Sequence, residues 1–165
     1  MSQDEILFHL GEVQSKLLED ASDVAVPVRM NIAAALLHLQ MFDRAKPLYA
    51  QIVSKKPAFN PAHLGMIDCA LGMQDFDAAL ALADDALARW PRNQALLSRR
   101  VVALARLGDR EPATVAASQL ASSSKVQDEA TWIRTAKVLG DVGLPAVAEQ
   151  MLSRITSFCS LCEVI

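Results

Sequence analysis

Apolar and polar residues alternate along most of the chain with the period of an α-helix. Apolar side chains recur three and four residues apart, in segments separated by short polar turns. The first such stripe predicts an N-terminal helix over residues 4–18. Further helices are predicted over residues 26–39, 61–73, 93–107 and 128–142, and each is followed by a second helical segment.

The second helical segments repeat one another. Ala45, Ala79 and Ala113 are each 34 residues apart, and Pro57 and Pro91 share that spacing. A fourth copy brings Ala148 after 35 residues, which indicates one inserted residue. A single helical hairpin cannot bury its apolar face, so neighbouring hairpins stack and share a core. The chain is therefore predicted to be a stack of about four helical hairpins.

Turn residues mark the ends of the helices. Gly108 and Gly143 suit helix C-termini, where a left-handed backbone conformation is common. Asp43, Asp75 and Asp109 lie just before or inside the first turn of second helices. Their carboxylates are expected to accept hydrogen bonds from the free N–H groups there.

Composition agrees with an all-α fold and excludes some classes of function. Aromatic residues make up only 5% of the chain, and alanine and leucine carry most of its 52% hydrophobic share. The net charge of −3 comes without a basic run, which argues against binding nucleic acid. We see no secretory signal and no membrane span, and the three cysteines fit a reducing compartment, so the expected location is cytoplasmic.

A helical hairpin of 34 residues with these positions resembles the tetratricopeptide repeat. Trp132 occupies a position where that family often has tryptophan. The small residue early in the second helix and the larger residue four positions later also match, at Ala45, Ala79, Ala113 and Ala148, and at Tyr49 and Leu152. The resemblance implies a right-handed α–α superhelix, or solenoid, in one domain spanning residues 1–165. Residues 2–20 would be a capping helix, with a dimer contact as the alternative, residues 26–158 four repeats and residues 159–165 an apolar tail.

In such a solenoid the first helix of each pair lines the inner surface. The predicted groove is mainly apolar in its first half and gathers cations in its second half. Its residues are Met30, Asn31, Ala34, Leu37, His38, Leu64, Asp68, Leu71, Ser98, Arg99, Val102, Arg106, Ile133, Arg134 and Lys137.

These features predict a non-catalytic adaptor that binds a partner protein through a segment with apolar anchors and acidic residues. The carboxylate-binding clamp of some tetratricopeptide proteins is not carried over, because Met30 and Ala34 stand at its first positions. One alternative is a chaperone for type III secretion substrates, which resembles this chain in size and in its pI of about 5.6. A polar cap helix is expected at the C-terminal end, and its apolar residues leave three alternatives: the tail folds back, a second copy of the chain or a partner covers it, or the chain is a fragment of a longer one.

Chemistry-bearing residues favour structural roles. Cys159 and Cys162 form a Cys-x-x-Cys pair without a second pair or a thioredoxin-like strand, so an enzyme or metal protein using them is the least favoured alternative. The four residues that begin at Cys162 also fit a loose prenylation box. His9, His38 and His63 lie on different predicted helices without ligand spacing. No catalytic motif is present, and neither a metal nor a cofactor is predicted.

Overall fold

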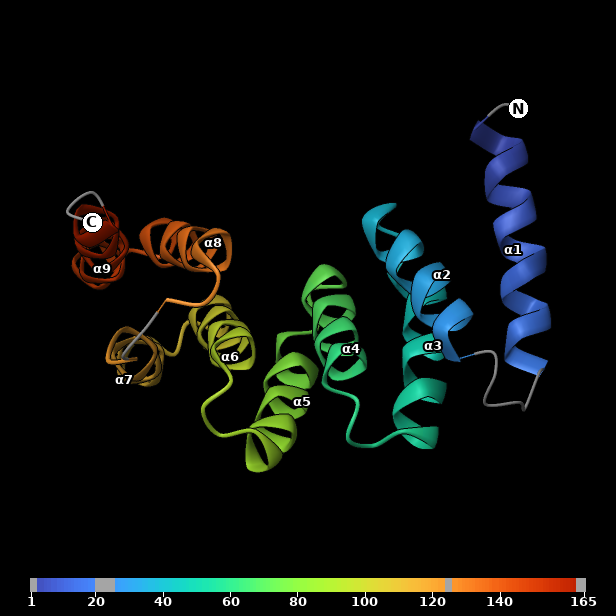
Figure 1. Ribbon diagram of the computed structural model, residues 1–165, viewed down its shortest axis with the longest axis horizontal. Helices are drawn as coiled ribbons and strands as arrows, with labels where there is room; N and C mark the ends of the chain where they lie inside the picture. The colour runs from blue at the N-terminus through green and yellow to red at the C-terminus, as the bar shows by residue number, and fades with distance from the viewer. Residues whose placement is uncertain (1–2, 20–25, 124–125, 163–165) are drawn as a thin grey trace. The chain divides into compact units, whose positions relative to one another are not determined.

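The computed structural model describes residues 3–19, 26–123 and 126–162, and the regular structure within these ranges is entirely α-helical (Figure 1). The chain divides into two compact units, an N-terminal unit (Met1–Asp75) and a C-terminal unit (Phe76–Ile165). The N-terminal unit contains α1 (Gln3–Glu19), α2 (Val26–His38), α3 (Phe42–Lys55) and α4 (Asn60–Gly72). The C-terminal unit contains α5 (Phe76–Arg89), α6 (Gln94–Leu107), α7 (Arg110–Ala121), α8 (Glu129–Asp141) and α9 (Pro145–Cys162).

The prediction of an all-α chain built from consecutive helices is confirmed. Each of the five helices for which the sequence predicts both ends begins and ends within one residue of the expected position. Helices that follow one another in the chain pack together inside each unit: α2 with α3, α3 with α4, α5 with α6, α6 with α7, and α8 with α9.

The helix C-termini repeat with the period of the sequence. Within residues 3–19, 26–123 and 126–162, four residues have positive φ angles: Gln40 at 58°, Gln74 at 61°, Gly108 at 89° and Gly143 at 81°. At each of them the next residue donates its N–H to a carbonyl five residues back, as Asp75 does to Ala70 over 3.0 Å. This is the Schellman motif, which satisfies carbonyl groups at a helix end. The positions are spaced like the repeated alanines, so one turn geometry recurs in all four copies.

Two of the four left-handed positions carry glutamine, which adopts this conformation at a cost of about 1 kcal/mol. Gln74→Gly should therefore raise the free energy of unfolding by about 1 kcal/mol. Gly108→Ala should lower it by a similar amount, because a Cβ there meets no atom within 4 Å and only backbone strain acts. Urea denaturation of the two variants measures both values. If the two changes shift stability in the same direction, this account of the turns is wrong.

The core of the N-terminal unit depends on close contacts between α3 and α4. Ala45 and Tyr49 on α3 are almost completely buried, as the repeat pattern predicts. The ring of Tyr49 lies against Gly65 on α4, and a Cβ on Gly65 would overlap that ring. Phe42 lies against Gly72 in the same way. Two glycines on α4 thus give aromatic rings of α3 the space that they occupy.

Burial in this core changes the titration of two weak acids. It raises the pKa of Cys69 from 9.0 to about 11 and the pKa of Tyr49 from 10.0 to about 12, with a smaller contribution from the Asp68 carboxylate. Both groups lose their protons at lower pH in the unfolded chain, so alkali favours unfolding.

The free energy of unfolding should therefore fall as the pH rises from about 9 to about 12. Cys69→Ala should remove the part of the decrease that begins near pH 9, and Tyr49→Phe the part that begins near pH 10. Urea denaturation at a series of pH values measures this dependence. An unchanged pH profile in both variants would show that these groups do not cause it.

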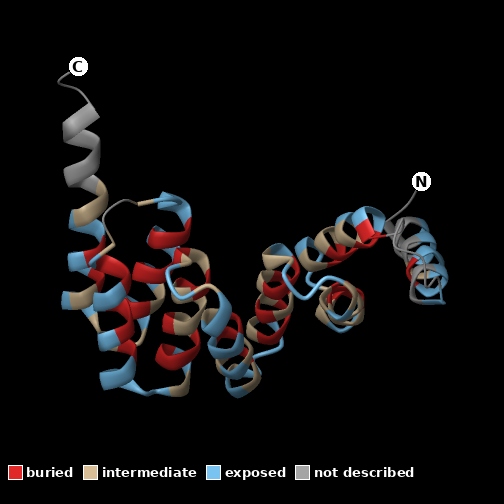
Figure 2. Cartoon of the chain, turned by 60° about the horizontal axis from the view of Figure 1, so that its bottom comes forward, coloured by how far each residue is buried: buried red, intermediate tan, exposed pale blue. Residues whose placement is uncertain are grey.

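The core of the C-terminal unit lies among α6, α7, α8 and α9. Figure 2 shows buried positions where the helices of this end of the chain face one another. Trp132 is the largest fully buried side chain, and Leu120 and Met151 are buried in the same cluster. Leu152, in contrast, is 41% exposed, although the repeat pattern places it with Tyr49. Tyr49 packs on the helix that follows its own, whereas α9 is the last described helix.

The predicted aspartate caps are only partly correct. Asp109 does occupy the N-cap of α7, but its side chain accepts no capping hydrogen bond. Side-chain caps are made by Asn93, whose Oδ1 accepts from the Leu96 N–H over 3.1 Å, and by Asp128 at the start of α8. Asp109 has a ψ of 73°, which differs from the extended backbone of Asn93 and Asp128.

Candidate partner-binding faces

The N-terminal unit exposes only part of the predicted groove. Asn31 and His38 on α2 are exposed. Met30 and Leu37 are half-buried and pack against the core of the unit, because they lie on the side of α2 that faces its neighbours. Leu64, Asp68 and Leu71 on α4 are also half-buried, as is Ala34 on α2.

In the C-terminal unit, α6 and α8 pack side by side through buried polar contacts (Figure 1). The Trp132 indole N–H donates to Gln94 Oε1 over 3.2 Å. One helical turn further along both helices, the Ser98 and Thr135 hydroxyl groups are 2.5 Å apart. Gln94 and Trp132 both precede the second contact pair, Ser98 and Thr135, along their own helices, so α6 and α8 run parallel.

This pairing brings the predicted cations of the C-terminal unit together. Arg99 follows the contact residue Ser98 on α6, and Arg134 precedes the contact residue Thr135 on α8. In parallel neighbouring helices, residues one step after and one step before a contact project to the same side. Val102 and Arg106 on α6 and Lys137 on α8 continue this face at helical spacing, and Ile133 lies one turn before Lys137, further around α8. We call this set the α6/α8 face: Arg99, Val102, Arg106, Ile133, Arg134 and Lys137.

The side chains of the α6/α8 face suit a binding surface. Arg106, Arg134 and Lys137 are exposed, Ile133 is 50% exposed, and Arg99 is half-buried. Within the described part of the chain, neither Arg106 nor Lys137 has an ion-pair partner. The carboxylates nearest in sequence are Asp109, three residues after Arg106, and Glu129 and Asp141 at the first and last residues of α8, with Asp128 just before it. The face therefore presents four cations around apolar side chains.

A hydrogen-bond network holds Arg134 in position. Its Nη2 donates to Thr131 Oγ1 over 3.0 Å, and the Thr131 hydroxyl donates to Asp128 Oδ2. The hydroxyl bond, the backbone N–H bond of Thr131 and the charge of Arg134 together keep the pKa of Asp128 below its ordinary value. Arg99 Nη1 similarly donates to the Ala95 carbonyl over 3.1 Å. Both guanidinium groups are thus oriented in advance.

Ser98, which was predicted to line the groove, is buried, and the sequence did not identify Gln94 as a buried contact residue beside it. Ser98 is only 3% exposed, because it forms the contact with Thr135 instead of facing solvent. Gln94 is also buried, and its Oε1 accepts hydrogen bonds from both Trp132 and the Gln127 N–H. These polar residues between apolar ones could have indicated a helix interface, because buried polar groups need hydrogen-bond partners.

No protein-family model matches this chain. A comparison with curated proteins also finds no significant match. The function must therefore be inferred from the residues themselves.

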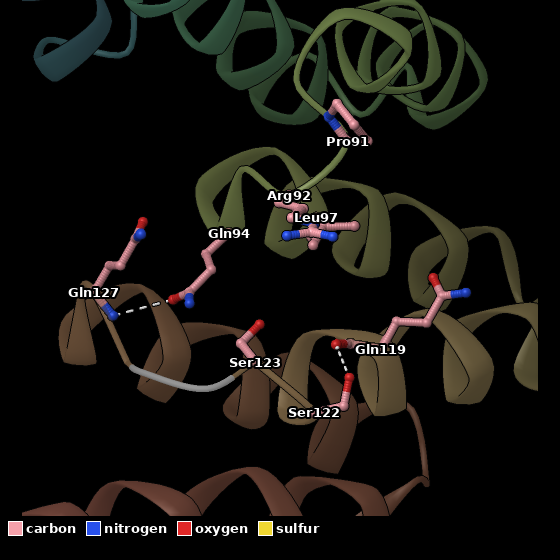
Figure 3. A pocket seen from close by; sticks show the side chains of 8 residues that line it. All are labelled: Pro91, Arg92, Gln94, Leu97, Gln119, Ser122, Ser123 and Gln127. Atoms are coloured by element: carbon pink, nitrogen blue, oxygen red, sulfur yellow. Dashed lines mark hydrogen bonds between the residues drawn. The ribbon is translucent and has the colours of Figure 1, made fainter.

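A polar pocket lies beside the α6/α8 contact, between the start of α6 and the end of α7 (Figure 3). It has a volume of about 610 Å³. Figure 3 shows the Gln127 N–H bonded to Gln94 and the Ser122 hydroxyl bonded to the Gln119 carbonyl at its edges. Its lining residues are Pro91, Arg92, Gln94, Leu97, Gln119, Ser122, Ser123 and Gln127. None of them is a carboxylate, histidine or cysteine, so this lining offers no pair for acid–base or nucleophilic catalysis.

The remaining candidate features are metal sites, the buried histidine, membrane spans and the terminal cysteines. Among them, no group of three or more His, Cys, Asp or Glu side chains could hold a metal ion. His63 is buried, with a ring nitrogen 2.9 Å from the Pro57 carbonyl. None of the helices in the described ranges is long and apolar enough to cross a bilayer. The side chains of Cys159 and Cys162, the prenylation box and the predicted dimer contact of the tail lie outside the described residues.

Proposed function

We propose that this protein is a non-catalytic adaptor that holds a segment of a partner protein on the α6/α8 face. The observation that carries the proposal is the grouping of four cations, together with the apolar residues Val102 and Ile133, on two parallel helices. The partner segment would place apolar side chains on these two residues. Its carboxylates would pair with Arg99, Arg134 and their neighbours, because guanidinium groups bind carboxylates with charge-assisted hydrogen bonds.

The recurring turns and buried alanines support a tetratricopeptide-like architecture, which we propose forms a right-handed superhelix of stacked hairpins. In that architecture the exposed face of the first helix of each hairpin is the binding surface. In the N-terminal unit, the exposed polar side chains of Asn31 and His38 would form the corresponding part of α2. A cytoplasmic location belongs to the same proposal.

Charge and orientation would have separate effects on binding. The cations would attract an acidic segment and speed its association, an effect that rising salt concentration screens. The hydrogen bonds that already orient Arg99 and Arg134 reduce the side-chain entropy lost when a partner binds. Binding should therefore be specific for acidic segments and weaker at high ionic strength.

Reversing the charge of Arg99 and Arg134 tests this proposal. We expect the Arg99→Glu/Arg134→Glu variant to bind its partner at least about tenfold more weakly, because two charge-assisted contacts become repulsive. Partners are captured from a lysate of the source organism, and the affinity for each captured protein is then measured by titration.

The control is Arg89→Glu/Arg92→Glu, which makes the same change in net charge away from the α6/α8 face. Circular dichroism must show that both variants remain helical. If both variants lost affinity equally, the change in net charge would explain the loss, and it would not support the α6/α8 face as the site. Unchanged affinity in the Arg99→Glu/Arg134→Glu variant would contradict the assignment of the site.

A further inference from the structure

The N-terminal unit has an apolar pocket that shares only Met30 and Asn31 with the predicted groove. It lies where the start of α2 meets the loop between α3 and α4, and its volume is about 320 Å³. Pockets that bind small ligands begin at about 300 Å³, so this one suits a single large side chain. Its lining residues are Val26, Pro27, Met30, Asn31, Lys56 and Phe59.

The walls of this pocket are held by the core and by the loop. Val26 is only 4% exposed, and Met30 and Phe59 pack against the same core. The Phe59 N–H donates to the Lys56 carbonyl over 2.9 Å, which closes the loop as a turn. The buried ring of His63 contacts the Pro57 carbonyl within that turn. The pocket is therefore preformed, and little ordering would oppose binding.

The chemistry of the pocket differs between its interior and its edge. Val26, Pro27, Met30 and Phe59 supply an apolar interior, while Asn31 and Lys56 are exposed and polar. None of the lining residues is acidic, and the first turn of α2 has no acidic residue either. Lys56 has no ion-pair partner among the described residues. A carboxylate at this edge would meet both the ammonium group and the positive end of the α2 dipole.

We propose that this pocket binds one large apolar side chain of a partner protein, with an adjacent carboxylate of the partner paired to Lys56. The proposal rests on the adaptor function and deepens it by naming where an apolar anchor is held. A few buried anchors in fitted pockets carry most of the energy of many protein interfaces. Met30 is thus a wall of the anchor site, and Phe59, Val26 and Lys56 complete it.

The test uses two small probes that differ in one group. N-acetyl-L-phenylalanine has an aromatic ring and a carboxylate, and N-acetyl-L-phenylalaninamide has the ring alone. Each is titrated into the ¹⁵N-labelled full chain and followed by NMR. We expect both to shift the amide signals of Val26, of residues 28–31, of Lys56 and of residues 58–59. We expect the acid to bind about threefold to fivefold more tightly than the amide, as one partly exposed ion pair allows.

Two lysine variants separate the role of Lys56 from net charge. Lys56→Gln should make the affinities of the two probes equal, while Lys55→Gln should preserve their difference. Equal binding of the two probes to the unaltered protein, or no localised shift up to the solubility limit, would overturn the proposal. That failure is distinct from failure of the adaptor function, which depends on Arg99 and Arg134 and is measured with the captured partner.

Discussion

Gly65→Ala should destabilise the N-terminal unit by about 1–3 kcal/mol, although the same change usually stabilises a helix. A methyl group on Gly65 would overlap the ring of Tyr49, which is 1% exposed. Either the ring leaves its position or α3 and α4 separate, and both reduce packing in the core. Urea denaturation measures the change.

Gly140→Ala is the matched control for this prediction. Gly140 also lies inside a helix, but a Cβ there meets no atom within 4 Å. This variant should gain up to about 1 kcal/mol of stability from helix propensity alone. Adding Tyr49→Leu to Gly65→Ala should recover part of the loss, because the smaller side chain vacates the space of the methyl group. A stabilised Gly65→Ala variant would show that the ring does not lie against α4.

Trp132→Ala should destabilise the C-terminal unit by about 3–5 kcal/mol. Trp132 is fully buried in the cluster shared by α6, α7, α8 and α9. Its removal leaves a large cavity and also removes the N–H donor to Gln94. Trp132→Phe keeps most of the buried area and loses the hydrogen bond, so it should cost less, about 1–2 kcal/mol.

The comparison for Trp132 is Val115→Ala on α7. Val115 is 58% exposed, and its truncation should change stability by less than about 0.5 kcal/mol. Urea denaturation followed by circular dichroism measures all three variants. A loss of less than about 1 kcal/mol for Trp132→Ala would contradict its place at the centre of the core.

The sequence predicted the helices well because each one is marked locally. Apolar spacing, the repeated alanines and the glycines at Gly108 and Gly143 are signals contained within one or two turns of chain. The left-handed turn at Gln74 could be inferred only from the repeat, since glutamine itself does not indicate that conformation. Local sequence signals thus predict where each helix begins and ends. The 34-residue repeat additionally predicts turn conformations, such as the one at Gln74, that the residue itself does not indicate.

The binding faces were harder to predict because helical spacing shows a stripe but not what covers it. Ser98 and Arg99 are neighbours in sequence, yet Ser98 is buried against α8 and Arg99 remains half-exposed. Met30 and Leu37 likewise turn toward the core, since α2 contacts α1, α3 and α4. Which side of a helix stays exposed depends on neighbours that are distant in sequence. The pocket around Phe59 and Lys56 likewise joins separate segments.

Site-specific photocrosslinking tests the central claim most directly, because it locates the partner without altering a charge. A photoreactive phenylalanine analogue replaces Val102 on the α6/α8 face or Val115 on α7, and each protein is irradiated in a lysate of the source organism. We expect a crosslinked partner protein from position 102 and none from position 115. Crosslinks from position 115 alone, or an equal set from both positions, would contradict binding on the α6/α8 face.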